Sequence, residues 1–104
     1  MSEAKLADVW TYRTSALYSE RERLALDFAL AAAAQPNEVT DAQFAQLRQH
    51  WSDSEIVELL GVVAMFGFLN RWNDSMATAL EAVPTEIAQR TVGAQGWSAG
   101  KHRR

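Results

Sequence analysis

The dominant feature of the hydrophobic pattern is an apolar run over residues 59–69, which contains no charged or strongly polar residue. Ser52 and Glu55 precede this run with the spacing of a capping box, so we predict a helix that begins at about Asp53 and extends toward Leu80. A helix without a polar face has to be surrounded, and the run is shorter than the ~20 apolar residues that cross a membrane. The pattern therefore predicts a central helix that the rest of the chain wraps.

Shorter amphipathic segments on both sides of this stretch predict further helices. They cover residues 3–15, 19–34, about 40–50 and 85–90. The predicted capping residues are Ser19 with Glu22, Thr40 with Gln43, and Thr85 at the start of the last helix. Pro84 predicts a break after the central helix, and the short link before the central helix predicts an antiparallel helical hairpin with the third helix.

No stretch alternates with period two for long enough to indicate a strand, so we predict an all-α fold, a small multihelical bundle of antiparallel helices. Residues 1–92 are expected to form a single helical domain. Residues 93–104 form a glycine-rich, basic tail that should be mobile unless a partner holds Trp97. A chain of this size buries a small share of its surface, so we expect oligomerisation to complete the bundle, most simply as a homodimer.

Composition and charge exclude several classes of function. The 104 residues carry a net charge of -3, which argues against a nucleic-acid surface. The absence of Cys excludes disulfides, thiol catalysis, thiolate zinc sites and iron–sulfur clusters. His50 and His102 lack the spacing of a zinc motif, and no glycine-rich phosphate loop is present, so we expect neither a metal nor a cofactor. The N-terminus has no apolar signal-peptide core, so we expect a cytoplasmic protein that does not bind membranes.

Polar residues follow the apolar run at helical spacing and form the candidate pocket. Its members are Asn70, Arg71, Asn73 and Asp74, with His50 from the end of the third helix. They have two interpretations: a structural hydrogen-bond network, which we favour, or a site at one end of the bundle. In the second, Arg71 would bind a substrate carboxylate, and a carboxylate or His50 would move the proton.

Small residues inside the central helix indicate a close helix contact. Gly61 and Gly67 each cost ~1 kcal/mol relative to Ala in an exposed helix, and Ala64 lies between them. Trp72 is a typical interface anchor, although core packing is the usual role of a Trp. We therefore predict an interface at Gly61, Ala64, Gly67 and Trp72, formed within the chain or across a two-fold axis.

Several segments, taken in order, resemble the carboxymuconolactone decarboxylase family, specifically its alkylhydroperoxidase-D-like branch. They are YSERERLAL at residues 18–26, VTDAQF at 39–44, HWSDSEIVEL at 50–59, FLNRWND at 68–74 and GWSAGKH at 96–102. Their order and spacing are similar to those in the C-terminal half of longer family members.

This resemblance implies an all-helical fold that assembles as dimers, trimers or hexamers. The Cys-x-x-Cys motif of the peroxidase branch lies in the half that precedes the matched part, and this sequence contains no Cys, so no catalytic residue is carried over. We therefore expect a short, cysteine-less family-like protein that acts as a binding or assembly module and not as a thiol peroxidase. Two alternatives stay open: a cysteine-independent enzyme of the lactone decarboxylase type with an interfacial pocket, and a subunit whose partner carries the Cys-x-x-Cys half.

Overall fold

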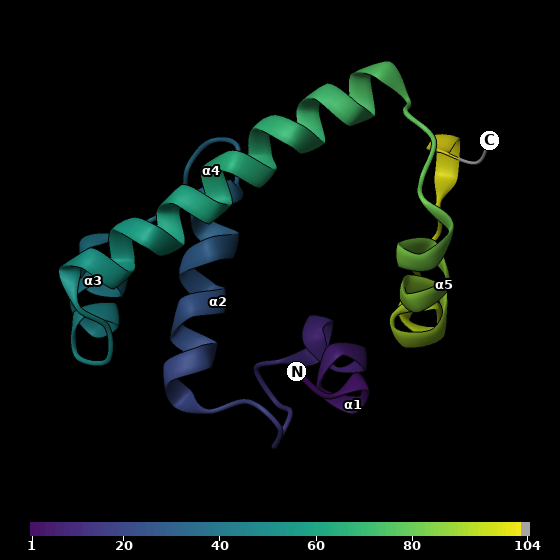
Figure 1. The fold of residues 1–104 in the computed structure, drawn as a ribbon. Helices are drawn as coiled ribbons and strands as arrows, with labels where there is room; N and C mark the ends of the chain where they lie inside the picture. Colours follow the sequence, from purple (N-terminus) through teal and green to yellow (C-terminus); the bar gives the residue numbers. More distant parts are fainter. Residues whose placement is uncertain (103–104) are drawn as a thin grey trace. The chain divides into compact units, whose positions relative to one another are not determined.

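The computed structural model describes residues 1–102, in which all regular secondary structure is helical, and this confirms the predicted all-α class (Figure 1). The α-helices are α1 (Glu3–Ala7), α2 (Glu20–Ala33), α3 (Asp41–Arg48), α4 (Asp53–Met76) and α5 (Ala82–Thr91). The 3-10 helices are η1 (Val9–Thr11), η2 (Gly93–Gln95) and η3 (Gly100–His102). None of the helices in this described part combines the length and the apolar character that a membrane span requires.

The chain divides into two compact units. One comprises Ser19–Arg71, and the other comprises Met1–Tyr18 together with the residues from Trp72 onward. The helix α4 therefore begins in the first unit and ends in the second. The predicted domain boundary at residue 92 stays a prediction.

Capping boxes fix the starts of α2 and α4, as the sequence predicted. Ser19 Oγ accepts from the Glu22 N–H at 3.2 Å, and Glu22 Oε1 accepts from the Ser19 N–H at 3.1 Å. The same reciprocal pair joins Ser52 and Glu55, at 3.2 and 2.9 Å. Each pair satisfies two backbone groups that the first helical turn would otherwise leave without partners.

The core of the Ser19–Arg71 unit is a cluster with one buried side chain from each of three helices. Phe28 of α2, Leu47 of α3 and Ile56 of α4 are its buried members. The Phe44 ring packs edge-on against Phe28, with the ring centroids 5.7 Å apart. Backbone packing is mainly between α2 and α3, so the predicted pairing of the third helix with the central helix is not the main contact of α3.

In the other unit, α1 packs against α5, and an ion pair of 2.6 Å joins Glu3 to Arg90. The first helix ends at Ala7 and not near residue 15 as predicted. Asp8 caps its end, and Ser15 Oγ donates to Asp8 Oδ2 at 2.8 Å. The Thr11 and Thr14 hydroxyls each donate to a carbonyl three residues earlier. Short polar side chains that bond locally in this way compete with helix formation, which explains the early end.

Two further boundaries differ from the prediction. The structure ends α4 at Met76, because Ala77 adopts a left-handed conformation with φ of 50°. Pro84 lies inside the first turn of α5, where a missing N–H leaves no hydrogen bond unmade. Thr85 is consequently not the cap, and its hydroxyl donates to the Glu81 carbonyl at 2.7 Å.

Within the Ser19–Arg71 unit, the other helices do not wrap the central helix, and cover by the rest of the chain stays a prediction. Among the residues of α4, only Ile56 is buried. The helix contacts α2 and α3 through its first turns. The α3 helix has eight residues against the 24 of α4, so it is too short to cover the apolar middle. The Ser19–Arg71 unit by itself therefore leaves most of its part of this apolar helix uncovered.

Leu47→Ala should lower the free energy of unfolding by about 2–5 kcal/mol, because Leu47 is fully buried and little can fill the cavity. Urea denaturation at fixed protein concentration measures this change. Leu30→Ala, at an exposed position of α2, is the matched control and should cost less than about 0.5 kcal/mol. Equal losses at the two positions would contradict the assignment of the core.

Ala77→Gly should raise the free energy of unfolding by about 0.5–1 kcal/mol, because glycine adopts the left-handed conformation without the steric cost that Ala77 carries. Ala45→Gly in the interior of α3 is the control, and it should lower stability by about 1 kcal/mol. Thermal unfolding of the two variants should thus shift in opposite directions, and a loss of stability in both would disprove the special role of Ala77.

Candidate functional site

The most prominent surface is the side of α4 that faces away from the core. Val57, Gly61, Ala64, Met65, Phe68 and Trp72 share this side by helical spacing, and we call them the outer face of α4. Ile56 and Leu59, which pack against α2 and α3, lie on the opposite side of the helix. The large side chains of the outer face are mostly exposed: Val57 at 69%, Met65 at 61%, Phe68 at 65% and Trp72 at 60%.

The predicted interface residues are all on α4, but the Ser19–Arg71 unit provides no contact for the two glycines. A Cβ atom added at Gly61 or at Gly67 would meet nothing within 4 Å. The alternative of a close helix contact within this unit is therefore excluded for both glycines. Gly61, Ala64 and Trp72 lie on the outer face, whereas Gly67 lies on the side of Ile56. Contact with another chain at these positions stays a prediction.

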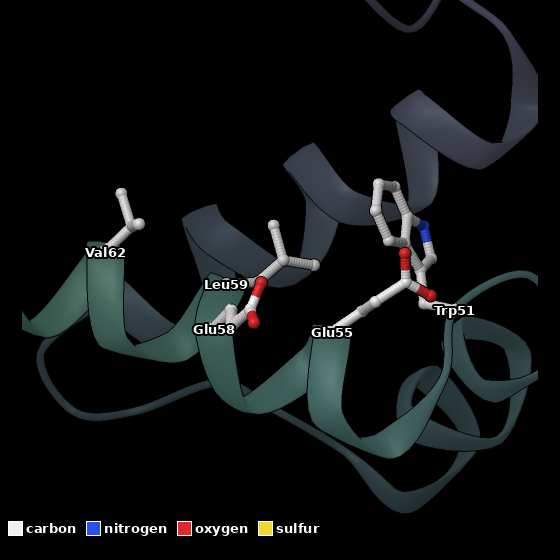
Figure 2. Close-up of a pocket in the computed structure, with 5 residues that line it drawn as sticks. All are labelled: Trp51, Glu55, Glu58, Leu59 and Val62. Atoms are coloured by element: carbon white, nitrogen blue, oxygen red, sulfur yellow. The ribbon is translucent and has the colours of Figure 1, made fainter.

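A shallow pocket of about 210 Å³ lies where α4 begins (Figure 2). Its lining consists of Trp51, Glu55, Glu58, Leu59 and Val62. Leu59 and Val62 make it an edge of the exposed apolar surface of α4, and two carboxylates and an indole supply its polar groups.

Arg21 contacts two of these lining residues, Trp51 and Glu55, and joins α2 to the turn before α4. Its guanidinium lies 3.6 Å from the centre of the Trp51 ring and donates to Glu55 Oε2 at 2.9 Å. The Arg21 Nε–H donates to the His50 carbonyl at 3.1 Å, and the Trp51 indole N–H donates to the Arg21 carbonyl at 3.0 Å. These four contacts hold the start of α2 against the α3–α4 turn.

The carboxylate of Glu55 accepts hydrogen bonds from both Arg21 and Ser52. The N–H of Ser52 lowers the pKa of Glu55 below its ordinary value of 4.5, with the Ser52 hydroxyl and Arg21 as further causes. The group therefore stays ionised at neutral pH and serves as a structural acceptor, since a general acid would need a raised pKa.

The residues of the candidate pocket have the following positions. Asn70, Arg71, Asn73 and Asp74 are exposed near the C-terminal end of α4, within little more than one turn. His50 is half-buried in the α3–α4 turn, with its Nε2 4.0 Å from Glu20 Oε2. None of these five residues lines the two pockets described here for residues 1–102, and the interfacial pocket stays a prediction.

One arrangement that the sequence did not indicate involves the tail. His102 Nδ1 lies 2.7 Å from the Thr78 carbonyl, and its Nε2 lies 2.9 Å from Asp74 Oδ1. The imidazole borders a cavity of about 340 Å³ that Glu86, Gln89 and other residues of α5 also line. Both ring nitrogens are thus within hydrogen-bond distance of an oxygen atom of the chain. No local signal links positions 28 residues apart, which is why sequence reasoning missed this pair.

Among the described residues, no group of three His, Asp or Glu side chains is placed to hold a metal ion. The carboxylates of Glu55 and Glu58 lie near the N-terminus of α4, where the positive end of the helix dipole stabilises negative charge.

Comparison with known proteins finds one distant similarity. Over 75 residues, or 72% of this chain, the sequence is 36% identical to the uncharacterized protein YnjA of Escherichia coli (strain K12). The match covers 41% of YnjA, so the chain spans less than half the length of this relative. No family model matches the chain, and no solved structure matches it.

Glu55→Gln should destabilise the protein at pH 7 but much less in acid. Because the folded-state pKa of Glu55 is lowered, its stabilising contribution is present above its ordinary value of 4.5 and is lost as the pH falls through the folded-state pKa. Urea denaturation between pH 3 and pH 7 should therefore show the stability of the wild type and the variant converging as the pH falls. Glu58→Gln, three residues along α4, is the control, and a pH-independent deficit in Glu55→Gln would contradict the electrostatic account.

Proposed function

We propose that this chain is an assembly module, a short and cysteine-less relative of the carboxymuconolactone decarboxylase type that is completed by another polypeptide on the outer face of α4. The observation that carries the proposal is the exposure of Val57, Met65, Phe68 and Trp72 on one side of a single helix. Large contiguous apolar patches on a protein surface mark interaction sites.

The size of the exposed surface supports this proposal. An aromatic side chain buries ~150–250 Å², so Phe68 and Trp72, each about three-fifths exposed, leave roughly 200–300 Å² in water by that scale. Met65 and Val57 extend the patch. Covering it would recover about 25 cal/mol for each Å² of apolar surface, which is several kcal/mol for these four side chains.

The polar side chains of the described residues support a module over an enzyme. Glu55 is held by Ser52 and Arg21, and both ring nitrogens of His102 are engaged. The similarity to YnjA, a protein more than twice as long as the matched segment, agrees with a helical unit that works together with further polypeptide. The resemblance in residues 18–102 adds the expectation of an oligomer.

Phe68→Glu should abolish assembly without unfolding the chain, because it places a charge at the centre of the proposed contact and leaves the Phe28–Leu47–Ile56 core untouched. The measurement is the apparent mass of a tagged chain in native lysate of the source organism. We expect the wild type well above the 11.6 kDa of one chain and the variant at that mass.

Leu30→Glu is the matched control for this experiment, because it charges another exposed leucine outside the outer face, on α2. Its apparent mass should equal that of the wild type. A wild-type chain that migrates as a single copy in native lysate would refute the proposed function.

A further inference from the structure

We infer that the pocket at the start of α4 binds a short primary alkylammonium ion, the protonated form of a free amine, with Glu58 as its counter-ion. This inference goes beyond the proposed function, because none of the residues that line the pocket belongs to the outer face of α4. The lining residues and Arg21 all belong to the Ser19–Arg71 unit, so this unit alone fixes the geometry of the pocket.

The walls of the pocket are held in place by contacts within the unit. Trp51 and Leu59 pack against the buried core cluster, and the Trp51 indole N–H donates to the Arg21 carbonyl at 3.0 Å. Glu55 is fixed by its capping box and by Arg21. Trp51 stands at one end of the lining and Val62 at the other (Figure 2). A ligand that enters a site of this kind orders few side chains, which favours its affinity.

The charges around the pocket favour a cation. The Arg21 guanidinium compensates the carboxylate of Glu55, at 2.9 Å. Within the Ser19–Arg71 unit, no hydrogen bond or ion pair engages the side-chain carboxylate of Glu58. One positive and two negative groups leave an excess of one negative charge, which attracts a cation and repels an anion.

The lining also requires an apolar part in the ligand. Leu59 and Val62 add aliphatic surface to the pocket, and Trp51 adds an indole ring. A bare metal ion would gain nothing from this surface, and residues 1–102 place no group of three His, Asp or Glu side chains to hold one. An organic cation uses both features, because its carbon chain covers apolar surface while its charge pairs with a carboxylate.

The positions of the charges orient the ligand. Arg21 lies over the Trp51 ring, 3.6 Å from its centre, and repels a second cation from that end of the pocket. The ammonium group is therefore placed at Glu58, and the carbon chain lies against Leu59 and Val62. A primary ammonium is a compact charge with three donors, so it pairs with a single carboxylate in several orientations.

The volume of the pocket sets the size of the ligand. Its 210 Å³ correspond to about seven water molecules at ~30 Å³ each, which suits an amine with about four to six carbons. The lysine side chain of another polypeptide carries the same chemistry. The Ser19–Arg71 unit contains helices and no strand, so it offers no sheet edge that would bind a peptide backbone. A free amine is therefore the occupant.

An NMR titration of the isotope-labelled full chain with n-pentylammonium chloride tests the site. The signals of the Trp51 indole N–H and of the backbone amides from Glu55 to Val62 should shift and saturate in the millimolar range. Pentanol, which has the same chain without the charge, and pentanoate, which has the opposite charge, should each bind at least about threefold more weakly. Equal binding of pentanol and pentylammonium, or no saturable shift at Trp51, would overturn the inference.

Glu58→Gln should weaken the binding of pentylammonium about threefold to tenfold and leave the binding of pentanol unchanged, because it removes the charge and keeps the shape. Glu38→Gln is the matched control, since it removes the same charge at another exposed position of the unit, outside the pocket. It should change neither affinity. The NMR signals of residues far from the pocket verify that both variants are folded. Equal weakening in the two variants would show attraction to net charge alone and would overturn the pairing with Glu58.

A lysine probe separates the free amine from a polypeptide. Nα-acetyl-lysine N-methylamide has the same ammonium group on a carbon chain, with a peptide group on each side. It should bind no more tightly than pentylammonium, and tighter binding would assign the pocket to a polypeptide and overturn the free amine. None of these results depends on the mass of the chain in native lysate, so this inference and the assembly module are tested separately.

Discussion

The apolar middle of α4 is the constraint on which the rest of this protein depends. A helix of 24 residues carries large hydrophobic side chains around its whole circumference, yet α2 and α3 reach only its first turns. Met65 and Phe68 find no cover within the Ser19–Arg71 unit. The physical solution is cover from outside, and the small residues at positions 61 and 64 shape the surface that such cover would meet.

In the Ser19–Arg71 unit, several contacts hold the start of α4 in place, whereas the side chains in its middle are exposed. Capping boxes at Ser19 and Ser52 satisfy the first turns of α2 and α4, and Arg21 links the two helices through Trp51 and Glu55. Glu55 serves both the cap and the ion pair, which is why its pKa is lowered. A rigid base of this kind presents the exposed side of α4 without fraying at the N-terminal end.

Polar side chains that could take part in catalysis or binding instead make contacts that hold the fold together. His102 bonds the Thr78 carbonyl and Asp74, and it ties the C-terminal residues to the end of α4. Asp74 was expected in a pocket, and its described contact is this imidazole. Such placements favour an interpretation in which the charged residues hold the fold while the apolar surface carries the function.

The sequence by itself determined the features that depend on residues three or four positions apart. The caps at Ser19, Thr40 and Ser52, the all-α class, and the membership of Gly61, Ala64 and Trp72 in one helical face all follow from spacing along a single helix. These are local properties, because the interacting atoms are brought together by the helix and by nothing else.

Only the tertiary structure decided the features that join distant positions. The stacking of Arg21 on Trp51 and the bonding of His102 to Asp74 cross about 30 residues, and no periodicity reports them. Helix propensity along the sequence also does not locate the helix ends well. The structure was needed to show the early end of α1, the left-handed conformation of Ala77 and the position of Pro84 inside α5. The coverage of α4 depends on the length and position of the neighbouring helices. The hydrophobic pattern of the sequence indicates only that an apolar helix needs cover, and it does not identify the chain that provides it.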